Sequence, residues 1–416
     1  MTNPYFTVAA VIAGVTLLQA AGGLLLVLLP LRMTAEGFSV QSMGWVAAAH
    51  GAGFLAGCLI TSRLVSTIGH VRAFAALAAA LSAIALAFAA FSSPAAWIAL
   101  RFAGGASFAG LYAVAEGWIA ERTPRALRGR VLGFYTVCTR VALVAAPLSL
   151  TALALEGPGA FMLVSVLCSL ALLPVTTTRS AHPATSGQRA LPMGHLYRLA
   201  PVGLLGCFSV GLINAPLLSL VPVYGAGAGL AFDTIVVLFP VLQLGSLVLQ
   251  WPLGRWSDRS DRRRVICALY VAVALLSLPI ALLDTPPEWL LLPLLFLLGG
   301  AALSIYAICI AHAGDHASPD QMVSLMSGLL LAWGVGAAIG PAVAAAVMDT
   351  VGARGLFLYI GVIALAFALY VVHRMWVRSP APVDGQVTFV DVPATSPAAA
   401  ELGVTDALRG RAAPRD

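Results

Sequence analysis

Four ionisable side chains, Glu116, Arg101, Tyr112 and Arg140, stand in parts of the chain that are otherwise almost wholly apolar. The first three belong to one apolar stretch. If that stretch is a helix, residues 101, 112 and 116 fall within about 60° of one another and share a face. A carboxylate in apolar surroundings is costly to ionise, whereas a nearby arginine favours its ionised form. These residues therefore predict a group that takes up and releases a proton or binds a charged solute.

Glu116 and Arg140 are expected to form an ion pair between neighbouring antiparallel helices. Counted from the charged loop between the two stretches, they lie about 9 Å and about 15 Å deep, a difference that an arginine side chain can span. Two interpretations remain open: a permanent pair that fixes packing, and a pair that responds to protons or substrate. His50, in another stretch, is likewise either a neutral, hydrogen-bonded side chain or a protonation site.

Further polar side chains inside the apolar stretches could line a cavity with this group. They are Gln19, Asn214, Gln243 and Tyr306. His312 and His316 have the spacing of metal ligands on a helix, but we interpret them as part of a solvated helix end. The six cysteines are scattered singly, so we predict no metal site and no cofactor.

Twelve apolar stretches of roughly 20 residues, long enough to cross about 30 Å of hydrocarbon as helices, must position these side chains. The 416 residues are 60% hydrophobic and 10% charged, with a mean hydropathy of +0.95, which excludes a water-soluble protein. The stretches lie near residues 5–31, 40–62, 71–92, 95–119, 131–153, 158–176, 197–223, 229–252, 265–284, 288–312, 321–347 and 353–376.

The second half of the chain repeats the first. Tyr112 recurs as Tyr306, and Pro147 recurs as Pro341, both after 194 residues (306 − 112 and 341 − 147). Duplicated bundles of membrane helices are typical of secondary transporters, which bind substrate near mid-membrane between two halves.

We therefore predict an all-α integral membrane protein whose twelve helices form two pseudo-symmetric six-helix halves. The halves would span residues 1–176 and 197–376. A cytoplasmic linker over 177–196 would join them, and a disordered cytoplasmic tail over 377–416 would follow.

The 23 basic residues are all arginines, and their distribution predicts the orientation. With twelve helices, the loops on one side carry sixteen arginines, and those on the other side carry only Arg32 and Arg354. The sixteen are Arg63, Arg72, Arg122, Arg125, Arg128, Arg130, Arg179, Arg189, Arg198, Arg255, Arg259, Arg262, Arg263, Arg264, Arg374 and Arg378. The positive-inside rule then places both termini in the cytoplasm. These loops account for the pI near 9.2, so no nucleic acid is expected as a partner.

The loop at residues 254–263 carries the most specific motif. Gly254, Asp258 and Arg262 match the pattern G-x-x-x-D-x-x-G-R-[RK], although Asp261 replaces the second glycine. That pattern is a cytoplasmic signature of the major facilitator superfamily, which the chain resembles along most of its membrane part.

The matching loop of the first half is a weaker copy. It keeps Gly69 and Arg72, but it has Ser62 and Ser66 where Gly and Asp are usual. The resemblance implies that both loops control the exchange between conformations. The expected gating residues are Gly69, Arg72, Gly254, Asp258, Arg259 and Arg262.

The fourth stretch carries a second resemblance. Arg101, Gly105 and Ala109 are similar to the superfamily pattern R-x-x-x-G-x-x-x-A, whose arginine is tied to proton coupling in drug antiporters. The run E-G-W at 116–118, with Tyr135, resembles the YcaD-like branch of bacterial permeases.

A third motif, G-x-x-x-G-P, is expected to pack helices. The eleventh stretch has it as Gly336, Gly340 and Pro341. The fifth stretch, where drug antiporters carry it, has Ala142 and Ala146 before Pro147.

These features together predict a secondary active transporter that moves a small solute across the cytoplasmic membrane by alternating access. We favour proton-coupled efflux of a small or amphiphilic compound; the alternative is a proton symporter or facilitator for uptake of an organic anion or other metabolite. The sequence holds no H-E-x-x-H, G-x-S-x-G or Walker loop, so an enzyme or a sensor is not expected. The expected partners are a small-molecule substrate, protons and the lipid bilayer, and we expect a monomer.

Overall fold

The computed structural model describes residues 4–124, 127–153, 155, 157–176, 193–283, 286–318 and 321–377. The predicted tail, 377–416, lies outside the described residues except for residue 377, and so does the predicted linker, 177–196, up to residue 192.

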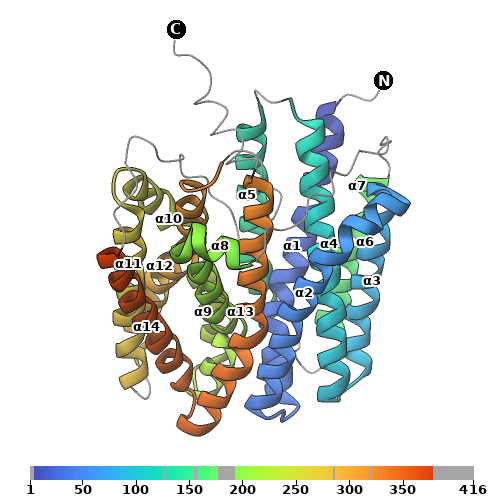
Figure 1. Ribbon diagram of the computed structural model, residues 1–416. Coiled ribbons are helices and arrows are strands. Elements are labelled where there is room, and N and C mark those ends of the chain that lie inside the picture. Colours follow the sequence, from blue (N-terminus) through green and yellow to red (C-terminus); the bar gives the residue numbers. More distant parts are fainter. Residues whose placement is uncertain are drawn as a thin grey trace. The chain divides into compact units, whose positions relative to one another are not determined.

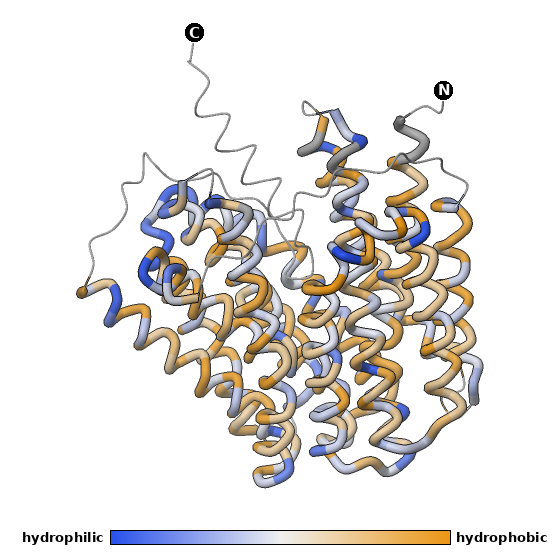
Figure 2. The backbone as a smooth tube through the Cα atoms, turned by 45° about the vertical axis from the view of Figure 1, so that its right-hand side comes forward, coloured by the Kyte–Doolittle hydropathy of each residue, from blue (hydrophilic) through white to orange (hydrophobic). Residues whose placement is uncertain are grey.

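Within the described residues, twelve helices are long and apolar enough to cross a membrane, as predicted (Figure 1). The helices of the first half are α1 (Pro4–Ala35), α2 (Val40–Ile68), α3 (His70–Ala90), α4 (Pro94–Arg122), α5 (Arg128–Ala145) followed by a 3-10 helix (Ala146–Ala152), α6 (Gly159–Leu170) and α7 (Leu172–Thr176). Those of the second half are α8 (Met193–Leu199), α9 (Pro201–Gly227), α10 (Phe232–Asp258), α11 (Arg262–Leu282), α12 (Glu288–Gly314), α13 (Met322–Val351) and α14 (Gly355–Val377). Figure 2 shows hydrophobic residues along the helices and hydrophilic residues gathered towards their ends.

Local signals explain several helix boundaries. The side chains of Ser39 and Ser93 cap the starts of α2 and α4, where they accept hydrogen bonds from Ser42 N and Ala96 N. Gly69 ends α2 and precedes α3 with φ of 81°, in a region that favours glycine. The glycine of the first-half loop motif is therefore the residue that allows the tight turn between these two helices.

The chain divides into two compact units by internal contacts. One comprises residues 1–187 with 218–240, and the other comprises residues 188–217 with 241–416.

Glycines bring α2 and α4 together in the first unit. A Cβ atom at Gly53 would overlap the carbonyl oxygen of Phe102, and one at Gly105 would overlap the carbonyl oxygen of His50. Only a residue without a side chain permits this approach of two backbones. The space at Gly105 is therefore filled by α2.

The second unit repeats this crossing between α10 and α12. A Cβ at Gly245 would overlap the carbonyl oxygen of Phe296, and one at Gly299 would overlap that of Leu242. Gly299 follows Gly105 by 299 − 105 = 194 residues, the interval of the sequence repeat. The duplication is therefore one of helix packing as well as of sequence.

The G-x-x-x-G-P motif lies where α13 meets α9. A Cβ at Gly336 would overlap the carbonyl oxygen of Phe208, and one at Gly340 would lie 2.8 Å from that of Leu212. Pro341 lies inside α13, which continues to Val351. In the first half, by contrast, Pro147 lies where α5 has given way to the 3-10 helix.

Candidate functional site

Glu116 lies on α4 with only 1% of its surface exposed. The Tyr135 hydroxyl of α5 donates a hydrogen bond to Glu116 Oε1 over 3.2 Å. One turn from Glu116, the Tyr112 hydroxyl donates to Gln19 Oε1 of α1 over 2.9 Å. These two hydrogen bonds join α4 to α5 and to α1 inside the first unit. Tyr112 and Gln19, both predicted to line a cavity, therefore lie in direct contact.

Tyr135 had no predicted role beyond the family resemblance. Its depth in the sequence could have predicted the contact with Glu116. Tyr135 lies about 10 Å into α5, counted from Arg128, and Glu116 lies about 9 Å from the end of α4, so the two residues are at similar depths. Arg140 lies five residues further along α5 and is half-buried. Its pairing with Glu116 remains a prediction.

Arg101 and His50 lie at the other end of α4 and its crossing with α2. Arg101 is buried, and its Nε atom has no hydrogen-bond partner among the described residues; the same holds for His50 Nδ1. The His50 ring meets Phe108 edge-on, with 6.1 Å between ring centroids. Buried polar atoms are rarely left without a hydrogen-bond partner. Water or a ligand could therefore bind at these two nitrogen atoms.

The predicted site residues of α4 therefore do not meet at one centre. Glu116 and Arg101 share a helix face, but 15 residues separate them, which is about 22 Å along the axis. Tyr112 lies between them. The polar side chains are thus spread along one face of α4, with the Glu116 carboxylate towards one end and the Arg101 guanidinium towards the other.

The predicted cavity residues of the second unit are polar but uncharged. Asn214 on α9, Gln243 on α10 and Tyr306 on α12 are all buried. Asn214 Oδ1 has no hydrogen-bond partner among the described residues. The Tyr306 ring packs edge-on against Trp333 of α13, with 6.3 Å between centroids. These three side chains therefore offer hydrogen bonding and aromatic contact without charge.

The ends of α10, α11 and α12 are joined by Arg262, which is 1% exposed. Its Nε atom donates to Asp315 Oδ2 over 2.8 Å, and its Nη2 atom donates to Asp258 Oδ1 over 3.1 Å. Its Nη1 atom donates to Ser257 Oγ over 3.1 Å. Asp258 and Arg262 were predicted as gating residues, whereas Asp315 was not. The structure shows that Asp315 is an ion-pair partner of Arg262. The predicted gating residue Arg259 is exposed beside this network, and Gly254 is buried in α10.

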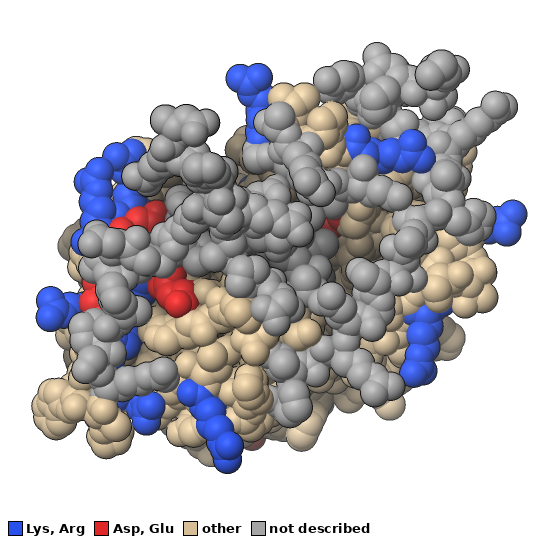
Figure 3. Space-filling view, turned by 45° about the horizontal axis from the view of Figure 1, so that its top comes forward, with Lys and Arg blue, Asp and Glu red and all other residues tan. Residues whose placement is uncertain are grey.

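Asp261 replaces a glycine of the motif because it caps α11. Its Oδ1 atom accepts from the Arg263 backbone N over 3.0 Å, and its Oδ2 atom pairs with Arg263 Nη2 over 2.9 Å. Burial raises the pKa of the Asp261 carboxyl, but the hydrogen bonds and charge of Arg263 outweigh burial, so the pKa lies below 3.8. In Figure 3 acidic side chains lie beside basic ones at one edge of the face.

The corresponding loop of the first unit is built differently. Arg72 is exposed. Ser66, at the position where aspartate is usual, donates its hydroxyl to Arg63 O of its own helix over 2.8 Å. The His70 ring lies 6.4 Å from that of Trp118 on α4. The two loops therefore differ. Ion pairs with carboxylates stabilise the loop of the second unit, whereas a serine hydrogen bond and packing of two rings stabilise that of the first.

The chain matches a known family of membrane proteins. The profile of the Major Facilitator Superfamily matches residues 11–244 and 233–404. The chain belongs to the Major Facilitator Superfamily. It is therefore a multi-pass membrane transporter and not a member of an enzyme family.

Among its relatives is the uncharacterized MFS-type transporter YcaD of Escherichia fergusonii. The two are 27% identical over 369 residues, which cover 88% of this chain and 95% of the relative. The predicted resemblance to the YcaD-like branch of the superfamily is therefore confirmed.

Solved structures of other superfamily members share the fold. The nucleoside transporter NupG is 14% identical, with a TM-score of 0.72 over 88% of this chain and 98% of its own. The D-xylose-proton symporter is 14% identical, with a TM-score of 0.72 over 89% of this chain and 97% of its own. At this identity the likeness shows the major facilitator fold alone.

Proposed function

We propose that this superfamily member exports a small, amphiphilic compound in exchange for protons, with Glu116 as the proton-carrying group. One observation carries the proposal: Glu116 is a carboxylate with 1% exposure inside a membrane helix, and Tyr135 donates to it. An ionisable group at such a place is costly and is typical of ion pathways.

Protonation of Glu116 changes the contacts of α4 with α5. The ionised carboxylate is a strong acceptor for the Tyr135 hydroxyl, whereas the neutral acid is a weaker one. A proton drives transport only if its affinity differs between the two conformations of the carrier. A bond between two helices whose strength depends on the proton supplies such a difference.

Efflux is supported by Arg101, Gly105 and Ala109, which follow the helix-four pattern of drug antiporters. Uptake by proton symport is the second candidate. It is supported by the buried Arg101 with its unpaired Nε atom, which suits an anionic or zwitterionic solute, and by the D-xylose-proton symporter of the same fold.

The test uses proteoliposomes with a pH-sensitive dye inside and an imposed pH gradient. Ethidium is the probe for amphiphilic efflux, and lactate, uridine and D-xylose are the probes for uptake. Exchange of one proton for one ethidium cation is electroneutral and sustains at most about a tenfold ethidium gradient per pH unit. We expect Glu116→Gln to abolish pH-driven accumulation while exchange of substrate across the membrane persists.

Glu288→Gln is the matched control, because it makes the same change at an exposed carboxylate, the first residue of α12; it should keep pH-driven accumulation. If Glu116→Gln still accumulated substrate on a pH gradient alone, the carboxylate would be structural and His50 the next candidate.

We also propose that the protein lies in the cytoplasmic membrane as a monomer, with halves at 1–176 and 197–376 and both termini inside. The arginine distribution supports this orientation. In a cysteine-free background, cysteines at the exposed positions of Arg63 and Arg259 should react only from the cytoplasm, and one at Arg354 should react only from outside. Labelling of Arg63 and Arg259 positions from opposite sides would rule the topology out.

A further inference from the structure

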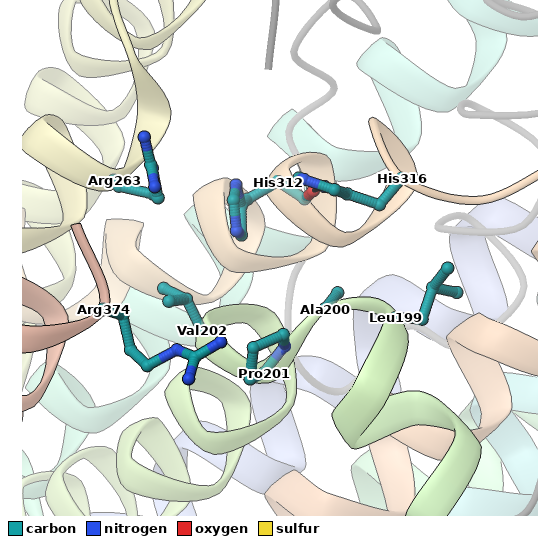
Figure 4. Close-up of a pocket in the computed structure, with 8 residues that line it drawn as sticks. All are labelled: Leu199, Ala200, Pro201, Val202, Arg263, His312, His316 and Arg374. Atoms are coloured by element: carbon teal, nitrogen blue, oxygen red, sulfur yellow. Dashed lines mark hydrogen bonds between the residues drawn. The ribbon is translucent and has the colours of Figure 1, made fainter. Parts of the chain in front are cut away.

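A small pocket in the second unit is lined by basic side chains from three helices (Figure 4). Arg263 comes from the start of α11, His312 from the last turn of α12, His316 from the turn after α12, and Arg374 from the last turn of α14. Pro201, the first residue of α9, closes one side. The cavity has a volume of about 20 Å³, enough for one or two water-sized groups.

Arg374 is the cation that this pocket leaves incompletely bonded. Its Nε atom is buried and has no hydrogen-bond partner among the described residues. Figure 4 shows its guanidinium reaching towards Pro201, with Arg263 and the histidines across the opening. The charge of Arg263 is offset by Asp261, its ion-pair partner. The pocket therefore retains the positive charge of Arg374.

His316 adds a hydrogen-bond acceptor. Its Nδ1 atom lies 2.9 Å from the carbonyl oxygen of His312, so Nδ1 carries the proton and donates, and Nε2 remains as an acceptor for other contacts. The two rings meet edge-on at 4.9 Å between centroids. Pro201 begins α9, and the first N–H groups of a helix give its N-terminus a partial positive charge. The helix end, like the side chains, favours an anion.

A metal ion does not fit this site. Arg263 and Arg374 repel a cation, and the nearby carboxylates of Asp261 and Asp315 already bind Arg263 and Arg262. Within the described residues, no three histidine, cysteine or acidic side chains are grouped to hold a metal.

We propose that this pocket binds the phosphate group of an anionic ligand, with Arg374 as the charged donor and His316 Nε2 as an acceptor for a hydroxyl of the ligand. The cavity takes one phosphate oxygen, which is the size of a water molecule, and the rest of the group lies at the opening. Two residues beyond Arg374, Trp376 is 84% exposed, as is typical of tryptophans at the membrane–water interface. The phosphate therefore comes from a phospholipid headgroup at that level or from a soluble phosphate.

The site is independent of the transported substrate, so its test needs no transport. Full-length protein is washed in uncharged detergent until phosphorus analysis finds no bound phospholipid. Its melting temperature is then followed by tryptophan fluorescence against inorganic phosphate, against phosphatidylglycerol, and against phosphatidylcholine and sodium chloride at matched ionic strength. We expect phosphate or phosphatidylglycerol to raise the melting temperature beyond the two references.

Arg374→Ala should weaken that effect about tenfold or more in ligand concentration, because it removes the charge-assisted donor. Arg255→Ala is the matched control: it removes an equal charge from an exposed arginine stacked 4.9 Å over Trp251, outside the pocket. His316→Gln gives a second variant if Arg374→Ala does not fold, and it should weaken binding by a smaller factor.

A response to inorganic phosphate would identify a soluble anion as sufficient, and a response to phosphatidylglycerol alone would identify the lipid. The proposal is overturned if neither raises the melting temperature above the references. It is equally overturned if Arg374→Ala and Arg255→Ala respond like the unaltered protein. Failure here leaves proton-coupled transport through Glu116 untouched.

Discussion

Arg262 is expected to be the residue whose loss most destabilises the second half. It joins α10, α11 and α12 through Asp258, Asp315 and Ser257. The two carboxylates differ in environment: the Asp315 side chain is 3% exposed, and that of Asp258 is 28% exposed. Arg262→Ala leaves the buried Asp315 carboxylate without this cation.

The expected losses of stability follow from the difference in burial between Asp315 and Asp258. Breaking a buried ion pair by removing one partner costs about 3–5 kcal/mol of unfolding free energy. For a domain of this size, each kcal/mol lowers the melting temperature by about 2–4 °C. Arg262→Ala should therefore melt about 6–20 °C lower. Asp258→Asn loses a partly exposed ion pair worth about 1 kcal/mol or less, hence about 4 °C at most.

The assay is thermal unfolding in a mild detergent, followed by tryptophan fluorescence. Asp315→Asn should fall between the two variants, and Arg259→Ala, which removes an exposed arginine three residues earlier, should melt within about 2 °C of the unaltered protein. The reasoning is wrong if Asp258→Asn destabilises more than Asp315→Asn, or if Arg262→Ala and Arg259→Ala melt alike.

Three other perturbations test separate parts of the structure. Gly105→Ala should prevent folding or lower expression severely, because its Cβ would overlap a backbone carbonyl of α2, whereas Gly104→Ala, whose nearest neighbours lie at 3.9 Å, should express normally. The pKa of Asp261 in the folded protein lies below 3.8. Its pairing with Arg263 therefore stabilises the protein above pH 3.8, and this stabilisation is lost as the pH falls through the folded pKa. Asp261→Asn should reduce the dependence of melting temperature on pH below about pH 3.8 and leave that dependence unchanged at higher pH. Asp258→Asn should slow transport without abolishing equilibrium binding of substrate, and loss of binding in a well-expressed variant would contradict its gating role.

The helices, the duplication and the family could be predicted from the sequence, because each follows from composition or from a repeated pattern. Twelve helices followed from the length and apolarity of their stretches, since a bilayer leaves the backbone few alternatives. The duplication followed from the interval between Tyr112 and Tyr306, and the family from the motif around Asp258. The breaks within helices were missed: α5 passes into a 3-10 helix at Ala146, and α8 begins at Met193 inside the predicted linker. Such boundaries depend on local packing rather than on hydrophobicity.

The sequence by itself determined which residue types the apolar helices contain, because an ionisable side chain among apolar ones is visible wherever the chain folds. It placed Glu116, Arg101 and Tyr112 on one helix face through the helical period alone. Only the tertiary structure decided their partners, because Tyr135 reaches Glu116 from another helix and Asp315 reaches Arg262 across 53 residues of chain. It also decided that Gly105 admits α2 rather than a ligand. Contacts between helices depend on rotation and depth in three dimensions, which a one-dimensional pattern does not specify.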